Sequence, residues 1–240
     1  MKSYLFSFLL GVSLALLPGC LEAQVLPNSE EFSARTIQLF ALVTVLSLAP
    51  GIAIMVTCFP FMVTVLSILR QAIGLQQSPP NMLIVSLALF LTYFVMEPVF
   101  VAAWEGGIGP FVRNEIQIED AFLPTLEPFR GFMVNRVDPE TFYSLADIRG
   151  NDVNTILAPD SQLSLLIPSF LLSEISRAFQ VGFLIFLPFV IIDLVVAAIL
   201  MSMGMMMVPP AIVSLPFKLA FFVVADGWTL ISGSLVRSYF

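Results

Sequence analysis

Five of the eleven methionines in this sequence fall within seven residues, and their thioethers are the first candidates for chemistry. The five are Met201, Met203, Met205, Met206 and Met207. The side chains could pack inside an apolar turn, or they could bind copper(I), which accepts soft sulfur ligands. They could also form a compliant seal, because the unbranched, flexible methionine side chain adapts to varied shapes. No cysteine or histidine is nearby, which disfavours copper and leaves packing and a seal open.

A second group of candidates consists of isolated charges inside or beside apolar segments. Its members are Arg70, Glu97, Glu174, Arg177, Asp193, Lys218 and Asp226. A charge removed from water is costly unless it is paired, so we predict that these are buried charges with partners. In a small secondary transporter, Glu97, Asp193 or Lys218 would instead relay protons.

Two of these charges are related by their spacing around the methionine-rich turn. Asp193 lies 12 residues before Met205, and Lys218 lies 12 residues after Met206. Two antiparallel helices that rise about 1.5 Å per residue would bring the two side chains to the same height. We therefore predict an ion pair between Asp193 and Lys218, unless each charge pairs with a neighbouring subunit or Lys218 extends to the surface.

The residues of common catalytic and metal sites are missing. The chain has no histidine and only two cysteines, Cys20 and Cys58, and it lacks a glycine-rich phosphate loop. The neighbouring acids Glu119 and Asp120 are expected on a solvated face. We predict no catalytic residue, no cofactor and no metal, and hence a protein that is not an enzyme. The net charge of −7 argues against nucleic acid as a partner.

The composition points to a membrane protein. Hydrophobic residues make up 58% of the chain and charged residues 11%, and the mean hydropathy is +0.97, whereas soluble domains carry about a quarter charged residues. Apolar stretches occur in two pairs, and each pair is joined by a segment with a Pro-Pro dipeptide, Pro79-Pro80 or Pro209-Pro210. We predict an all-α membrane-associated protein with two long kinked helical hairpins joined by a polar domain of mixed helices.

The predicted organisation has five parts. Lys2 and the short apolar stretch after it are typical of a secretory signal, and a faint lipoprotein motif at Cys20 leaves lipidation open. A signal would place the mature N-terminus outside the cytoplasm. The parts are a signal peptide at 1–23, a polar lead-in at 24–35, a first apolar hairpin at 36–104, an acidic extracytoplasmic domain at 105–162, and a second hairpin with the methionine-rich turn at 163–240.

Local signals also predict helix ends. Asp138 is expected to cap a helix that begins at Pro139, because aspartate favours the N-cap and proline the first helical position. Glu174 and Arg177 are expected to separate two apolar stretches, 163–172 and 178–200. Proline lacks a backbone N–H, so we expect the apolar helices to be interrupted at Pro50, Pro60, Pro98, Pro188 and Pro216.

Several long motifs follow one another in a recognisable order. Residues 69–81 read LRQAIGLQQSPPN, residues 87–98 read LALFLTYFVMEP, and residues 193–210 read DLVVAAILMSMGMMMVPP. The shorter motifs RGFM at 130–133, SLPFK at 214–218 and VADGW at 224–228 accompany them. Together these motifs resemble the FliP family of flagellar biosynthetic proteins from about Thr36 onward.

The resemblance implies a function in protein export. FliP-like proteins form the core of the type III export gate, in which several copies assemble with FliQ-like and FliR-like subunits and work with FlhA/FlhB-like components. Unfolded flagellar subunits pass through the centre, and the methionine-rich turn faces the channel and closes it. The implied location is the bacterial inner membrane within the flagellar basal body. An injectisome export gate, built from homologues in the same family, is the alternative.

The sequence departs from the family in one segment. Residues 57–61 read TCFPF, where the family usually has TSFTR, so Pro60 is added and a basic residue expected near Phe61 is missing. A contact that this arginine makes in the family is therefore not expected here.

Overall fold

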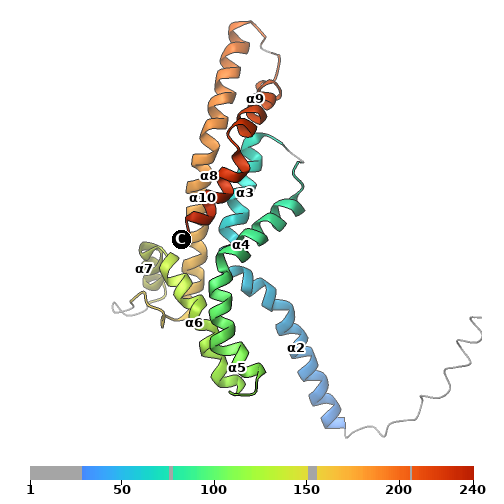
Figure 1. Ribbon diagram of the computed structural model, residues 1–240, viewed down its shortest axis with the longest axis vertical. Helices are drawn as coiled ribbons and strands as arrows, with labels where there is room; N and C mark the ends of the chain where they lie inside the picture. The colour runs from blue at the N-terminus through green and yellow to red at the C-terminus, as the bar shows by residue number, and fades with distance from the viewer. Residues whose placement is uncertain (1–28, 76–77, 151–155, 206) are drawn as a thin grey trace, which may run out of the picture. The chain divides into compact units, whose positions relative to one another are not determined.

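A computed structural model describes residues 29–75, 78–150, 156–205 and 207–240, and every regular element within these ranges is helical (Figure 1). The all-α fold predicted from the sequence is confirmed. The chain divides into two compact units, of which the first ends at Pro50 and the second begins at Gly51. The elements are α2 (Ser29–Met55), α3 (Phe59–Ile73), α4 (Asn81–Ala103), the π-helix η1 (Trp104–Ile108), α5 (Gly109–Val112), α6 (Ile118–Arg136), α7 (Pro139–Ile148), α8 (Leu163–Ser202), α9 (Pro210–Val224) and α10 (Gly227–Arg237).

The predicted signal peptide lies outside the described residues. Helix α2 begins at Ser29, inside the segment predicted as a polar lead-in.

The first hairpin is formed by α3 and α4, which contact each other on either side of the predicted Pro-Pro turn. Helix α3 ends where Gly74 adopts a left-handed conformation with φ +89°, and the Gly74 N–H donates to the carbonyl of Gln71. Glycine adopts this conformation without the strain that a Cβ would add. Helix α4 starts at Asn81, directly after Pro80.

The prolines interrupt the helices less than the sequence suggested. Of the expected breaks, only the one at Pro60 is confirmed, because Pro60 lies in the first turn of α3 after a short turn at 56–58. Helix α8 is a single helix of 40 residues, without the separation expected at Glu174 and Arg177. A proline inside a helix has no backbone N–H, so the helix loses one of its backbone hydrogen bonds. The many remaining bonds in the long apolar stretches on both sides of the proline allow the helix to continue. Helices run through the remaining positions, Pro50, Pro98, Pro188 and Pro216.

The acidic segment folds into short helices that pack on the hairpins. Helix α6 contacts α4 and α8, and α7 contacts α8. The contact between η1 and α6 is close, since a Cβ on Gly107 would lie 2.6 Å from the carbonyl oxygen of Ala121.

The predicted cap of α7 is confirmed. The Asp138 carboxylate accepts hydrogen bonds from the Thr141 hydroxyl (2.8 Å) and the Thr141 N–H (3.0 Å), and Pro139 opens the helix. These bonds favour the charged carboxylate and hold the pKa of Asp138 below its ordinary value.

Helix α3 forms the centre of the second unit, where it packs against α8, α4 and α9 (Figure 1). Its approach to α8 is close at Gly182, where a Cβ would lie 2.4 Å from Ile68 Cδ1. A second cluster joins α6, α7 and α8 through Met133, Phe142 and Phe170. The fully buried face of α3 consists of Phe61, Met62, Val65, Leu66, Leu69 and Ala72.

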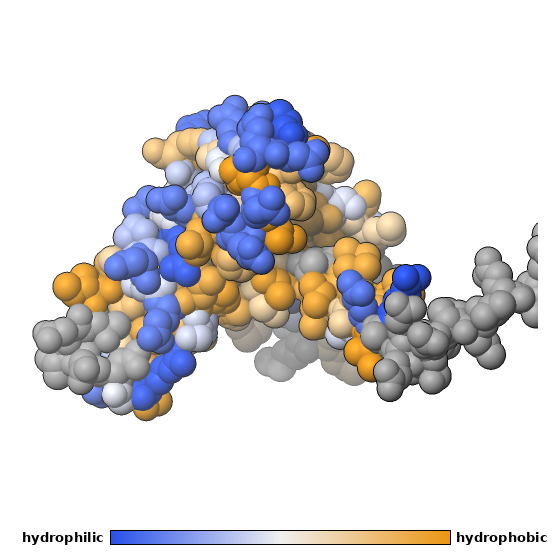
Figure 2. Space-filling model, turned by 90° about the horizontal axis from the view of Figure 1, so that it is seen from below, coloured by the Kyte–Doolittle hydropathy of each residue, from blue (hydrophilic) through white to orange (hydrophobic). Residues whose placement is uncertain are grey.

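Much of the apolar surface stays outside these clusters. Three helical stretches within the described residues are long and apolar enough to cross a membrane, namely 35–55, 81–112 and 163–202, and the bent pair α9 and α10 is a possible fourth. Hydrophobic side chains reach the surface between hydrophilic patches on the face drawn in Figure 2. Exposed apolar area on this scale fits a protein surrounded by lipid or by other chains, so the chain is membrane-associated.

The second cluster provides a test of this packing. Phe142 is completely buried, whereas the ring of its neighbour Tyr143 is half exposed. We expect Phe142→Ala to lower the free energy of unfolding by about 3–5 kcal/mol through lost burial and a cavity. Tyr143→Ala is the matched control and should have a much smaller effect in thermal unfolding of the detergent-solubilised chain. Equal losses in the two variants would contradict the packing of α7 on α8.

Candidate functional site

The methionine-rich turn connects α8 to α9 and exposes its thioethers. Helix α8 ends at Ser202, and Gly204 reverses the chain with φ +76°. Met206 lies outside the described residues. The other four methionines of this turn do not pack into the core of their own chain, and their exposed fractions are 62% for Met201, 64% for Met203, 38% for Met205 and 97% for Met207.

An apolar groove lies beside this turn, between the end of α8 and the start of α9. Its volume is about 500 Å³, and its walls include Val195, Ile199, Met203, Met205 and Phe217. The walls are almost entirely apolar, so the groove suits hydrocarbon side chains rather than a polar ligand.

Below the groove, the predicted ion pair between Asp193 and Lys218 is confirmed. The Lys218 Nζ lies 2.6 Å from Asp193 Oδ2. The Ser214 hydroxyl, one turn earlier on α9, donates to the other carboxylate oxygen at 2.5 Å. Lys218 is buried and Asp193 is half exposed, with side-chain exposures of 8% and 38%. The ion pair therefore joins α9 to α8 at the height along the two helices that the residue spacing predicted.

The same ammonium group also reaches a third helix. Lys218 Nζ donates to the carbonyl of Ala72 at 3.3 Å, in the last turn of α3. Carbonyls at a helix C-terminus lack intrahelical partners and carry partial negative charge, so a cation is favourable there. We refer to Asp193, Ser214, Lys218 and the Ala72 carbonyl as the lysine brace, which joins α3, α8 and α9.

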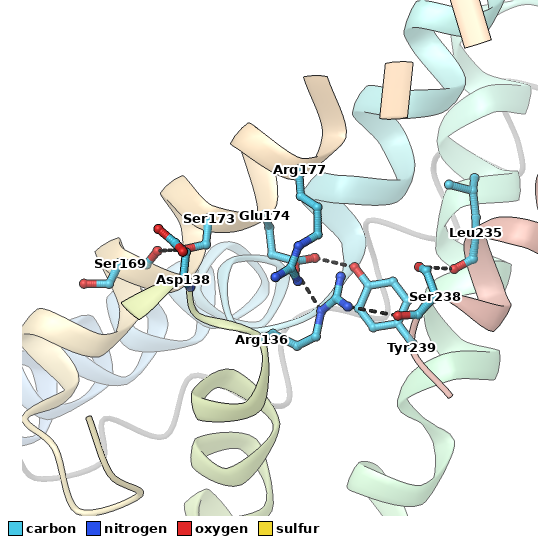
Figure 3. Close-up of polar contacts among 9 residues, drawn as sticks. All are labelled: Arg136, Asp138, Ser169, Ser173, Glu174, Arg177, Leu235, Ser238 and Tyr239. Atoms are coloured by element: carbon cyan, nitrogen blue, oxygen red, sulfur yellow. Dashed lines mark hydrogen bonds and ion pairs between the residues drawn. The ribbon is translucent and has the colours of Figure 1, made fainter. Parts of the chain in front are cut away.

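A second polar cluster lies at the other end of α9 and α10, and Figure 3 shows its side chains converging on Glu174. The Glu174 carboxylate is fully buried and lies 3.1 Å from Arg136 Nε and 3.6 Å from Arg177 Nη1. The Tyr239 hydroxyl donates a short hydrogen bond to the same carboxylate. Arg136 also donates to the carbonyl of Ser238 at 2.9 Å. Arg136 of α6 and Arg177 of α8 thus supply positive charge beside one buried carboxylate, and Tyr239 of the C-terminal tail supplies a neutral donor.

The ring of Tyr239 packs against the side chains of Arg136, Phe132 and Phe61. The Arg136 guanidinium lies 4.0 Å from the ring centroid, Phe132 stacks on it at 6.1 Å, and Phe61 meets it edge-on at 5.6 Å. Burial, followed by the charge of Glu174, raises the pKa of Tyr239 well above its ordinary value, so the hydroxyl keeps its proton and remains a donor.

The resemblance led us to expect a basic residue near Phe61. The Phe61 side chain is buried and meets the Tyr239 ring edge-on, so this residue has a packing role in the structure.

The other predicted buried charges have different environments. Glu97 and Asp226 are exposed in the isolated chain, so their burial against partners stays a prediction. Asp226 occupies the N-cap position of α10 without a capping bond to a backbone N–H, and its carboxylate accepts from the Thr229 hydroxyl at 3.1 Å. Arg70 is half-buried and donates to Asn81 across the first hairpin, and Arg177 is half-buried beside Glu174.

Sequence reasoning missed Arg136, Ser214 and Tyr239. The signal that could have found Arg136 and Tyr239 was the isolated Glu174, and for Ser214 it was Asp193, since a carboxylate removed from water requires donors. Arg136 and Tyr239 are separated from Glu174 by 38 and 65 residues, so no local spacing pointed to them.

No group of three or more histidine, cysteine, aspartate or glutamate side chains that could hold a metal ion occurs among the described residues. Cys58 is buried in the turn before α3, and burial raises the pKa of its thiol to about 12, so it stays protonated. Cys20 lies outside the described ranges.

The fold and these sites define a class, an all-helical membrane protein whose apolar hairpin carries an exposed methionine-rich turn and is held by internal ion pairs. The family model described as the FliP family matches residues 42–235. The chain is 51% identical to the flagellar biosynthetic protein FliP of Rhizobium meliloti over 89% of this chain and 87% of that protein. It is 45% identical to that of Caulobacter vibrioides over 99% and 91%, and 44% identical to that of Bacillus subtilis over 88% and 96%. The chain belongs to the FliP family, as its motifs indicated.

The lysine brace predicts an asymmetric response to mutation. Asp193→Asn should destabilise the fold by about 3–5 kcal/mol, because it leaves a buried ammonium without its counter-charge. Lys218→Met should cost less, because water can reach the half-exposed Asp193 carboxylate. Thermal unfolding in detergent measures both effects.

The exchange of the two charges tests the pairing itself. Asp193→Lys combined with Lys218→Asp should recover part of the stability lost in each single variant. Recovery should be incomplete, since a carboxylate at position 218 would face the Ala72 carbonyl. A double variant no more stable than either single variant would contradict direct pairing.

Proposed function

We propose that this chain, a component of flagellar biosynthesis through its family, is a core subunit of the flagellar type III protein export gate. Several copies surround a channel for unfolded flagellar subunits, and the methionine-rich turn seals that channel. The observation that carries the proposal is the exposure of the thioethers at the connection between α8 and α9. Flexible, polarizable side chains that are unpartnered in one copy can close against their equivalents in other copies.

The lysine brace supports this role mechanically. A seal needs a fixed base and an adaptable surface. Asp193 and Lys218 fix the two helices beneath the turn, while the turn itself carries no ion pair among the described residues. The side chains that would meet in the channel are therefore adaptable, whereas the helices that present them are not.

The surface of the chain supports assembly with partners. The proposed partners are other copies of the chain, FliQ-like and FliR-like subunits and FlhA/FlhB-like export components. Exposed Glu97 lies within the apolar stretch of α4, where a charge is costly unless a neighbour pairs with it. The proposed location is the flagellar basal body in the bacterial inner membrane, with the N-terminus outside the cytoplasm after signal cleavage.

The seal can be tested by removing its thioethers. Replacement of Met205, Met206 and Met207 by alanine should make closed gates leak ions and small solutes, because the compliant filling is lost. Ion flux into vesicles that contain the purified complex measures the leak. Met82→Ala is the control, since Met82 is an exposed methionine at the start of α4, outside the methionine-rich turn. Tight vesicles together with loss of bound copper would instead identify a copper(I) site.

A proton-coupled secondary transporter is the competing function, and the paired Asp193 and Lys218 within apolar helices favour it. Size separates the two candidates. A gate subunit extracted in mild detergent should have a native mass several times the 26.4 kDa of one chain, together with other subunits. A monomer or dimer that moves a small solute would overturn the gate. Export of flagellar subunits rather than effectors would distinguish the flagellar gate from an injectisome gate.

A further inference from the structure

Helix α10 is loosely packed on the body of the second unit. Only Gly227, Ile231 and Leu235 are buried along it. Two apolar pockets that are partly open to the surface lie between α10 and α8, and Leu230, Ile231 and Ile185 line both of them, with volumes of about 310 Å³ and 220 Å³. A helix with few buried contacts and incompletely filled space beside it belongs to the least stable part of a fold.

The N-terminal end of α10 has the geometry of a hinge. The axes of α9 and α10 differ by 61° across a short break. Asp226 adopts a left-handed conformation there, with φ +48°. At Gly227 a Cβ would lie 2.2 Å from the Phe222 ring, so the backbone passes close to that ring. Non-helical residues between two helices can absorb a change of angle without unfolding either helix.

The C-terminal end of α10 is fixed by side chains of other elements (Figure 3). Tyr239 donates to Glu174 of α8, and Arg136 of α6 donates to the Ser238 carbonyl. This attachment is incomplete, because the buried Nη2 of Arg136 has no acceptor within the described parts of the chain. An unsatisfied donor lowers the net stability of the cluster and therefore the cost of releasing it.

We propose that α10 is a hinged arm, which pivots at Asp226–Gly227 and is held closed by a latch formed by Tyr239 with Glu174 and Arg136. When the latch is released, the arm moves away from α8 and exposes the apolar walls of the two pockets. The lysine brace lies on α9, before the hinge, so α9 keeps its position while α10 moves. This proposal goes beyond the function proposed above and does not depend on the methionine seal.

Hydrogen exchange of the full-length protein in detergent tests the arm. Tyr239→Phe keeps the stacked ring and removes only the hydroxyl that donates to Glu174. A helix of 11 residues that is released from its packing is marginal in water, so amides of residues 227–237 should then exchange about ten- to a hundredfold faster, the effect of losing a hydrogen bond to a charged group. Amides of α3 and α8 should remain as slow as in the parent protein. Tyr143→Phe, which changes an exposed tyrosine, is the matched control and should leave exchange unchanged.

Trp228, at the start of the arm, provides a second measurement. The chain has two tryptophans, so Trp104→Phe leaves Trp228 as a single fluorescent reporter, 5.4 Å from the Phe222 ring. Adding Tyr239→Phe should increase the quenching of its fluorescence by acrylamide. If Tyr239→Phe does not fold, Arg136→Lys, which keeps the charge beside Glu174 and loses the bond to Ser238, should give the same local effect.

The outcomes are distinct. Faster exchange confined to residues 227–237 supports the hinged arm. Exchange that rises equally in α3, α6 and α8 would show that Tyr239 stabilises the whole fold. Unchanged exchange would show that the Tyr239 hydroxyl does not hold α10 against α8. Either result overturns the proposal. The methionine variants of the seal should leave the hydrogen exchange of residues 227–237 unchanged. Failure of the seal and failure of the hinged arm can therefore be told apart.

Discussion

The ammonium of Lys218 lies where three apolar helices exclude water, and the arrangement of those helices follows from the need to keep it paired. A charge in such a place is tolerated only with a counter-charge and with further hydrogen bonds. Asp193 supplies the charge and the C-terminal end of α3 supplies a carbonyl. Ser214 completes the site by donating to the carboxylate. Hydrophobic contacts alone would let α9 slide along α8, whereas this pair fixes its height.

The same logic explains the second polar cluster. Glu174 is buried in the first half of α8, where Arg136 of α6 and Arg177 of α8 supply positive charge and Tyr239 of the C-terminal tail donates a hydrogen bond. The two clusters lie at opposite ends of the segment formed by α9 and α10. Between the two clusters the chain bends at Asp226, and two apolar pockets remain between α10 and α8. The segment is therefore fixed at two places and weakly packed in between.

The outer surface has a different physical character. Large apolar side chains along α2, α4 and α8 remain exposed in the isolated chain, and so do the methionines of the α8–α9 turn. A soluble monomer would not tolerate this much exposed apolar area, whereas a membrane-associated chain can. The buried charges of the two polar clusters pair inside the chain, and the large apolar side chains stay on its surface.

The sequence by itself determined the features that depend on local spacing. The composition and the paired apolar stretches predicted the helical, membrane-associated class. Asp138 and Pro139 predicted the start of α7. The equal number of residues between the methionine-rich turn and each of Asp193 and Lys218 predicted that these two side chains pair. These succeeded because capping and helical rise act over a few residues or along one hairpin. Tertiary structure alone decided that helices continue through Pro98 and Pro188, because that depends on what surrounds the unpaired carbonyls. It also decided that Glu97 stays exposed and that Glu174 meets Arg136 and Tyr239, since those partners are brought together by the packing of helices far apart in the chain.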